Sequence, residues 1–217
     1  MMFNLVIFDL DGTLIDTIAD LGTAVNAALR ARGLPLHATE EYRAMVGHGV
    51  RNLVKRAMPE PLREDGALLD GLLEQFLDYY LQHIDAFSRP YPGIPELLSD
   101  LSAAGVQLAV ASNKFQSGAE KLIRRMFPEI PFAAILGGRS GAPLKPDPAV
   151  VDSILKKAGA AREETVLVGD SATDMATAAA AGIAGVAVSW GFRSREALAG
   201  APRIVDTVGQ LREILLG

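Results

Sequence analysis

The chain has 217 residues, 49% of them hydrophobic, so one domain, or one domain with a large insertion, has enough apolar residues for a substantial core. Its formal net charge of −5 argues against a general nucleic-acid-binding protein, and the absence of cysteine excludes disulfides, thiolate metal sites and a cysteine nucleophile. The three histidines, His37, His48 and His83, are too scattered for a convincing zinc site.

The first apolar run, which starts at Leu5, does not read as a targeting or membrane segment. No basic region precedes it, and Asp9 and Asp11 interrupt it early. No stretch approaches the roughly 18 uninterrupted apolar residues that a membrane-spanning helix needs. We therefore expect a cytoplasmic protein that binds neither membranes nor nucleic acid.

A short apolar segment, Leu5 to Phe8, leads directly into two carboxylates. Its uninterrupted, partly β-branched composition predicts a strand that is buried on both faces. Asp9 and Asp11 follow, and Gly12 permits a sharp turn that aims both side chains at one point. Two crowded acids repel each other unless a cation or a proton relieves the repulsion. By itself the pattern is equally compatible with a solvated acidic turn.

A long helical block follows this strand. Asp16 is expected to cap the first helix, whose apolar residues keep helical spacing until Gly33 ends it. Further helices are predicted over 39–45, 50–58 and 70–84. No strand is predicted from about Ile15 to His83, and the block is much longer than an ordinary connection between parallel strands. We predict an inserted helical cap domain, residues 15–86.

Strands and helices alternate in the remainder of the chain. Strands are predicted over 106–111, 132–136, 165–168, 185–189 and, at an edge, 203–205. Helices are predicted over 95–104, 118–126, 148–158, 174–181 and 208–215. This alternation predicts an α/β fold with a doubly wound, Rossmann-like parallel sheet. The first strand would complete this core domain, which is predicted to comprise residues 1–14 and 87–217, with the cap free to close about connections near Ile15 and Phe87.

Polar residues gather where the predicted strands end. They are Asp9 and Asp11, then Ser112 and Asn113, then Lys145 in a loop, then Asp170 and Asp174. Each has an ordinary structural explanation as a turn, a helix cap or a solvated loop charge. Because the carboxyl ends of parallel strands share one edge of the sheet, together they predict a single cleft.

The chemistry that these groups suit is phosphoryl transfer. Asp9, Asp170 and Asp174 offer hard oxygen ligands, which suit Mg²⁺ rather than zinc. Lys145 supplies a fixed positive charge and Ser112 a hydroxyl donor for phosphate oxygens. A carboxylate attacks a phosphate dianion only when cations offset their repulsion. One aspartate would then act as nucleophile and another as general acid and base.

Four segments carry a family resemblance. They are Asp9-Leu10-Asp11-Gly12-Thr13-Leu14, Ser112-Asn113, Lys145-Pro146-Asp147-Pro148 and Gly169-Asp170-Ser171-Ala172-Thr173-Asp174-Met175. In order and spacing they resemble the four motifs of the haloacid dehalogenase superfamily. The resemblance covers the whole chain, because the predicted helical block falls where that family inserts its cap.

The resemblance implies a division of labour between the first two acids. Asp9 would attack phosphorus and form an aspartyl-phosphate. Asp11 would protonate the leaving oxygen and then activate the water that hydrolyses the intermediate. Dehalogenases of this superfamily lack an acid at the position of Asp11, so the phosphoryl-transfer branch is favoured.

The resemblance also implies two sets of binding residues. Mg²⁺ would be held by Asp9, the main-chain carbonyl of Asp11, Asp170 and, directly or through another ligand, Asp174. The phosphoryl group would be bound by Ser112, Asn113 and Lys145, with help from Thr13.

A glycine-flanked loop in the predicted cap bears on the substrate. Val46-Gly47-His48-Gly49-Val50-Arg51 resembles the corresponding loop of phosphoglycolate phosphatases, as does Ser112-Asn113-Lys114. Two interpretations remain open. Gly47 and Gly49 would serve only a helix–helix turn, or the loop would bind substrate, with His48 and Arg51 facing the site and Arg51 meeting a substrate carboxylate.

The resulting hypothesis is a Mg²⁺-dependent phosphatase, a monomer or homodimer, that acts on a small phosphorylated metabolite, with 2-phosphoglycolate as the leading substrate. A sugar-phosphate mutase resembling β-phosphoglucomutase, a pyrophosphatase and a sugar phosphatase are the catalytic alternatives. A non-catalytic phosphate-binding module is disfavoured because Asp9 and Lys145 are both present. A dinucleotide-binding enzyme is disfavoured because no Gly-x-Gly-x-x-Gly follows the first strand.

Overall fold

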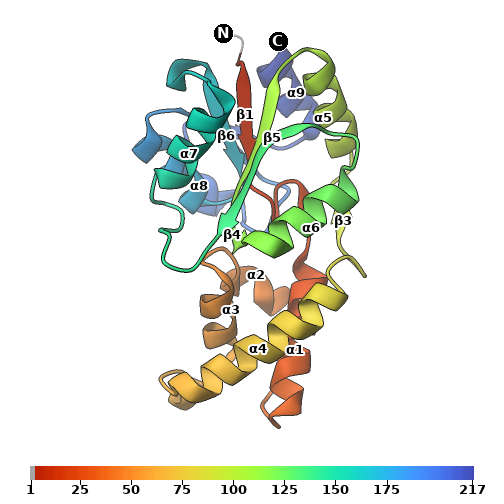
Figure 1. Ribbon diagram of the computed structural model, residues 1–217, viewed down its shortest axis with the longest axis vertical. Helices are drawn as coiled ribbons and strands as arrows, with labels where there is room; N and C mark the ends of the chain where they lie inside the picture. Colours follow the sequence, from red (N-terminus) through yellow and green to blue (C-terminus); the bar gives the residue numbers. More distant parts are fainter. Residues whose placement is uncertain (1–2) are drawn as a thin grey trace.

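The computed structural model describes residues 3–217 as an α/β core with a helical cap at one end (Figure 1). The core sheet has six strands in the order β5-β4-β1-β6-β7-β8, and every neighbouring pair is parallel. The strands are β1 (Leu5–Phe8), β4 (Gln107–Phe115), β5 (Phe132–Gly138), β6 (Thr165–Gly169), β7 (Ala184–Val188) and β8 (Ile204–Val205). The predicted fold class is confirmed.

Strand β1 lies inside the sheet, between β4 and β6, because all four of its side chains are apolar. Successive residues of a strand point to opposite faces. Val6 and Phe8 pack on the face covered by α5 (Ile94–Ala103), α6 (Gln116–Met126) and α9 (Val208–Leu216). Leu5 and Ile7 pack on the face covered by α7 (Ala149–Ala158) and α8 (Ala172–Ala181). The two helical layers thus bury β1 completely.

The cap consists of four helices below the sheet in Figure 1. They are α1 (Ile18–Ala31), α2 (Tyr42–Met45), α3 (Val50–Ala57) and α4 (Gly66–Gln82). Helix α4 begins four residues before the predicted start, because Asp65 caps it by accepting a hydrogen bond from the Leu68 amide at 2.9 Å. No helix within residues 3–217 is both long and apolar enough to cross a membrane.

The connections between core and cap differ from the prediction. A short strand, β2 (Ile15–Asp16), pairs antiparallel with β3 (Arg89–Pro90), so the expectation of no strand from about Ile15 to His83 was wrong. The pairing places the two connections side by side. Asp16 is not the cap of α1, since the N-cap residue is Thr17, although an Asp16 oxygen accepts from the Ile18 amide at 3.3 Å. The predicted domain boundaries themselves stay predictions.

Strand β4 also departs from the prediction, in a way that matters for the site. It was expected to end at Ala111, but it continues to Phe115 with a register shift against β5. Ser112, Asn113 and Lys114 therefore belong to the strand rather than to a turn after it. These polar residues break the apolar run of the strand, which is why the sequence predicts an earlier end, but all three line a pocket at the edge of the sheet.

Candidate active site

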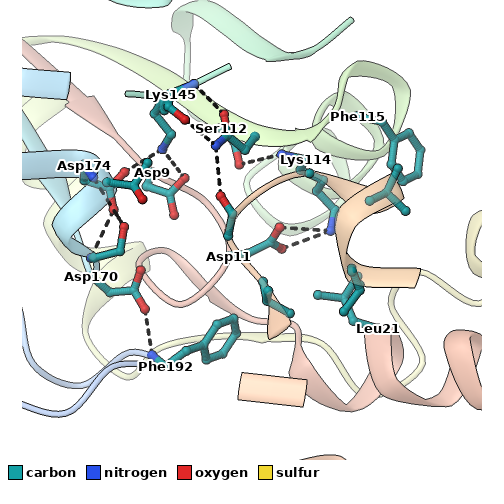
Figure 2. A pocket seen from close by; sticks show the side chains of 18 of the residues that line it. Asp9, Asp11, Leu21, Ser112, Lys114, Phe115, Lys145, Asp170, Asp174 and Phe192 are labelled. Carbon is teal, nitrogen blue, oxygen red and sulfur yellow. Dashed lines mark hydrogen bonds and ion pairs between the residues drawn. The ribbon is translucent and has the colours of Figure 1, made fainter. Parts of the chain in front are cut away.

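A pocket lies where the carboxyl ends of β1, β4 and β6 meet the cap (Figure 2). Its polar wall comes mainly from the core, and includes Asp9, Asp11, Ser112, Asn113, Lys114, Lys145, Asp170, Ser171 and Asp174. Its apolar wall comes mainly from the cap, and includes Leu21, Val46, Val50, Leu53 and Phe76. The structure thus brings the predicted strand-end residues together beneath the predicted cap.

The turn after β1 fits closely against the strand-end groups. The Asp9 amide donates to Val168 O on β6 at 2.8 Å, which holds the Asp9 side chain at the carboxyl end of the sheet. Gly12 has φ +89°, and a Cβ at this position would lie 2.4 Å from Asp170 Oδ2. Only glycine permits this backbone conformation and this approach.

Lys145 is the centre of the ionic contacts beside Asp9. Its Nζ lies 2.7 Å from Asp9 Oδ1, 2.6 Å from Asp174 Oδ1 and 2.8 Å from Ala111 O. These three acceptors match the three donors of an ammonium group. Burial by itself would lower the pKa of Lys145, but Asp174 and Asp9 outweigh burial and raise the pKa above its ordinary value. Lys145 is therefore a permanent cation.

Three buried carboxylates surround this cation. Asp9, Asp170 and Asp174 each offer an oxygen, and these oxygens lie within 4.8 Å of one another. Burial raises the pKa of Asp9 to about 6, although Lys145 opposes the shift. Burial, with the charges of Asp9 and Asp174, raises the pKa of Asp170 to about 8. One lysine does not balance three carboxylates, so the cluster fits a divalent cation that prefers oxygen ligands.

Asp170 and Asp174 each accept further hydrogen bonds, from a backbone amide and, for Asp174, also from a serine hydroxyl. Asp170 Oδ2 accepts from the Phe192 amide at 2.7 Å. Asp174 Oδ2 accepts from Ser171 Oγ at 2.6 Å and from the Ser171 amide at 3.1 Å, which forms the capping box of α8. These contacts hold both carboxylates in fixed orientations.

Asp11 points away from this cluster (Figure 2). Its carboxylate accepts from Thr17 Oγ1 at 2.7 Å and lies 3.0 Å from Lys114 Nζ. Lys114 Nζ also donates to the Tyr80 hydroxyl of the cap at 2.7 Å. The Asp11 carboxylate is thus turned away from the cluster. The main-chain carbonyl of Asp11, and not its side chain, stays the predicted ligand for Mg²⁺.

The three remaining candidates for phosphate binding lie in different environments. Ser112 lines the pocket, and its Oγ accepts from the Lys114 amide at 3.3 Å. Asn113 donates to Gly47 O at 2.9 Å and to Lys145 O at 3.0 Å, and accepts from Lys145 N at 2.8 Å. Its side chain therefore bridges core and cap, and its predicted part in phosphate binding stays a prediction. Thr13 is fully buried behind the pocket, where its Oγ1 has no hydrogen-bond partner among residues 3–217.

In the cap loop, the glycines and the two charged or polar residues between and after them lie in different places. Gly47 and Gly49 line the pocket with φ values of +114° and +81°. His48 and Arg51 are exposed, and neither is among the residues that line the pocket. Arg51 Nη1 lies 2.5 Å from Asp70 Oδ1 on α4. In this arrangement Arg51 points along the cap surface rather than into the pocket, and its contact with a substrate carboxylate stays a prediction.

The loop after β7 supplies pocket residues that sequence reasoning missed. Arg193 donates through Nη2 to Val46 O at 2.5 Å and through Nη1 to Arg43 O, both in the cap. Its neighbour Phe192 donates its amide to Asp170. No motif marks these residues, because their position depends on how the cap sits on the core. Lys114 was noted only as part of the segment Ser112-Asn113-Lys114 and was given no role. A strand that continues past Ser112 places the side chains of Ser112 and Lys114 on one face.

Comparison with known proteins assigns the family. Residues 6–188 match the model of the family described as haloacid dehalogenase-like hydrolase. The chain belongs to this family. It is 41% identical to a Mesorhizobium japonicum protein named phosphoglycolate phosphatase, over 88% of this chain and 85% of that protein. It is 35% identical to phosphoglycolate phosphatase 1 of Pseudomonas aeruginosa, over 98% of this chain and 78% of that protein.

Solved structures agree with this assignment. A predicted phosphoglycolate phosphatase from Haemophilus somnus superposes with a TM-score of 0.90 at 29% identity, covering 99% of this hydrolase and 98% of that chain. CbbY from Rhodobacter sphaeroides, solved in complex with phosphate, superposes with a TM-score of 0.77 at 27% identity, covering 97% and 96% of the two chains. A variant of CbbY was solved with xylulose-(1,5)-bisphosphate.

Proposed function

We propose that this hydrolase is a Mg²⁺-dependent phosphatase that cleaves a small phosphate monoester through an aspartyl-phosphate, with 2-phosphoglycolate as its best substrate. The carrying observation is the contact between Lys145 and Asp9 at 2.7 Å inside a buried carboxylate cluster. Such a contact brings an attacking carboxylate and a phosphate-binding cation to one point at the floor of the pocket. The names of the relatives in Mesorhizobium japonicum and Pseudomonas aeruginosa support the substrate.

The residues present fit Mg²⁺. Asp9, Asp170 and Asp174, with the main-chain carbonyl of Asp11, would hold the ion, since hard oxygens are the ligands that it prefers. When bound, the ion offsets the charge between the attacking carboxylate and the phosphate oxygens. The excess of carboxylates over lysine in the cluster supports this assignment.

The reaction then has two displacement steps. An Asp9 oxygen forms a bond to phosphorus as the bond from phosphorus to the ester oxygen breaks, and Asp11 gives its proton to that oxygen. Asp11 next takes a proton from water, the water oxygen attacks phosphorus, and Asp9 leaves as a free carboxylate. The positive charge of Lys145 lies beside the phosphoryl oxygens in both steps, and the Ser112 hydroxyl donates to one of them. The apolar cap wall limits the access of bulk water to the reacting atoms.

A panel of esters assayed with Mg²⁺ and with EDTA tests the proposal. Phosphate release is measured from 2-phosphoglycolate, glucose 1-phosphate, xylulose 1,5-bisphosphate, inorganic pyrophosphate and p-nitrophenyl phosphate. We expect the highest kcat/KM for 2-phosphoglycolate and no turnover in EDTA. Isomerisation of glucose 1-phosphate without phosphate release would identify a mutase instead, and full activity in EDTA would contradict the metal assignment.

A further inference from the structure

The reaction proposed above leaves one buried cation of the pocket unused. Lys114 lies on β4, two residues after Ser112, and its side chain is only 2% exposed. Its Nζ lies 3.0 Å and 3.3 Å from the two oxygens of Asp11 and 2.7 Å from the Tyr80 hydroxyl. A buried lysine on a pocket wall is unfavourable for folding unless its charge is used. Its placement therefore indicates a function in ligand binding.

The ammonium group of Lys114 carries three donors, and three acceptor atoms lie within reach of it, namely the two oxygens of Asp11 and the Tyr80 hydroxyl. The contact with Asp11 Oδ2, at 3.3 Å, is the longest of the three, so a ligand carboxylate that approaches Lys114 would replace this contact. Tyr80 does not neutralise the charge, because burial raises the pKa of its hydroxyl well above the ordinary value and keeps it protonated. The side chains of Leu21, Phe76 and Phe115 also line this pocket. In such apolar surroundings a contact between opposite charges is strong.

The position of Asp11 defines where the tail of a substrate lies. Asp11 protonates the leaving oxygen in the proposed reaction, so that oxygen lies within hydrogen-bond distance of its carboxylate. In 2-phosphoglycolate a single methylene separates this oxygen from the carboxyl carbon. A carboxylate so close to the leaving oxygen falls within reach of Lys114 Nζ, which itself lies 3.0 Å from Asp11 (Figure 2).

The other cations near the pocket are already engaged. Lys145 uses its three donors on Asp9, Asp174 and Ala111 O. Arg193 gives both terminal nitrogens to carbonyl groups of the cap. Arg51 pairs with Asp70 on the surface. Lys114 is thus the cation best placed to bind a second anionic group of the substrate, in addition to its phosphate.

We propose that Lys114, positioned by Tyr80 and Asp11, determines specificity by binding the carboxylate of the substrate beside the leaving oxygen. This inference rests on the proposed phosphatase function and extends it, because it names the residue that separates carboxylated esters from neutral ones. A neutral tail leaves the ammonium group without the partner that a carboxylate supplies, so discrimination follows from one buried charge.

The test compares 2-phosphoglycolate with its carboxamide, which has nearly the same size but no negative charge on its tail. The measured quantity is the ratio of the two kcat/KM values, anionic over neutral, in wild type and Lys114→Met. We expect the substitution to lower this ratio about 100-fold, as truncating one partner of a buried charge pair does. If Lys114 served only to hold Asp11, both esters would slow equally and the ratio would stay unchanged, which would overturn the inference.

Further variants distinguish the competing cations. Lys55→Met is the matched control, because Lys55 pairs with Glu64 outside the pocket and should leave the ratio unchanged. Arg193→Met and Arg51→Met test the alternative cations, and a larger loss of discrimination in either than in Lys114→Met would contradict the proposal. Tyr80→Phe keeps both charges and removes one hydroxyl, so it should lower the ratio several-fold even where Lys114→Met folds poorly.

A binding measurement gives a readout without turnover. In an Asp9→Asn background, calorimetry with the intact esters should show that 2-phosphoglycolate binds more tightly than the carboxamide, and that adding Lys114→Met removes the difference. A difference that survives would overturn the inference.

The outcomes separate this inference from the proposed function. A wild type that prefers 2-phosphoglycolate, with the preference intact in Lys114→Met, overturns the inference alone. A wild type that prefers another carboxylated ester, such as 2-phospholactate, with the preference lost in Lys114→Met, supports the inference and overturns the proposed substrate. A wild type that shows no preference for anionic tails overturns both.

Discussion

Two buried lysines contact carboxylates in this pocket, and they differ in where their partners come from. Lys145 contacts Asp9 and Asp174, which all belong to the α/β core. Lys114 contacts Asp11 in the core and Tyr80 on cap helix α4. The first site is complete without the cap, whereas the second is assembled only when the cap sits on the core. In the proposed reaction, phosphoryl transfer would therefore take place at the core, and the substrate would be selected at the boundary between core and cap.

Stability does not explain either site. A buried ion pair is roughly neutral, or even unfavourable, against well-packed apolar residues, whereas losing one partner costs about 3–5 kcal/mol. Such sites are therefore retained for what the charges do. Substitutions in the two sites should therefore have different effects on turnover, and the largest effect is expected at the nucleophile.

Removing the nucleophile should abolish the chemistry of the first site. Asp9→Asn removes the attacking oxygen charge, so we expect kcat to fall at least about 10⁴-fold for every ester. Thermal unfolding should still show a cooperative transition. Asp152→Asn is the control, since Asp152 is half exposed and pairs with Arg162 away from the pocket. Substantial turnover by Asp9→Asn would show that the nucleophile is misassigned.

Replacing the first lysine should slow all substrates alike. Lys145→Met leaves Asp9 and Asp174 without their shared cation, so we expect kcat/KM to fall about 10²–10³-fold for carboxylated and neutral esters alike. Lys157→Met, an exposed position on α7, is the matched control. A loss confined to carboxylated esters would reverse the division between Lys145 and Lys114.

The carboxylate cluster should link Mg²⁺ binding to pH. The pKa of Asp9 is raised to about 6 and that of Asp170 to about 8, from 3.8. Between pH 4 and 8 the folded, metal-free protein therefore binds more protons than the unfolded chain, so its stability falls as pH rises. Mg²⁺ competes with these protons, and the increase in Tm that Mg²⁺ causes should grow by several degrees from pH 5.5 to 8.5.

Differential scanning calorimetry with Mg²⁺ or EDTA measures this effect. Asp170→Asn cannot take up the proton, so the increase in Tm should become small and nearly independent of pH. An increase in the wild type that shrinks as pH rises would contradict the assignment of the cluster as the cation site.

A substitution at the connection between core and cap should have the smallest effect on turnover. Buried Asp20 accepts from Ser88 Oγ at 2.6 Å, Ser88 N at 2.7 Å and Phe87 N at 3.0 Å. Asp20→Asn places an amide donor against these donors, so we expect a loss of about 1–3 kcal/mol in urea unfolding and only a few-fold drop in kcat. Asp78→Asn, on the exposed side of α4, is the control. A drop in kcat as large as that of Lys145→Met would mean that the connection takes part in the chemistry.

The elements that sequence predicted best are those with local signals. Leu5–Phe8 is a buried strand as predicted, because a short, partly β-branched apolar run is typical of a strand buried on both faces of a sheet. The boundaries that failed are those where polar residues continue a regular element, as Ser112 to Lys114 continue β4. At these positions polar side chains face the pocket, so the apolar pattern that predicts a strand is interrupted although the strand continues.

By itself the sequence determined the α/β class, the helical insertion, the family and the carboxylates at the strand ends, because runs, spacings and motifs are properties of neighbouring residues. Only the tertiary structure decided which charges meet. It turned Arg51 towards Asp70, engaged the Asn113 side chain with backbone, and placed Lys114 between Asp11 and Tyr80. The physical reason is that each of these contacts joins residues far apart in the chain. Their geometry depends on the register of β4 and the seating of the cap, which no local pattern encodes.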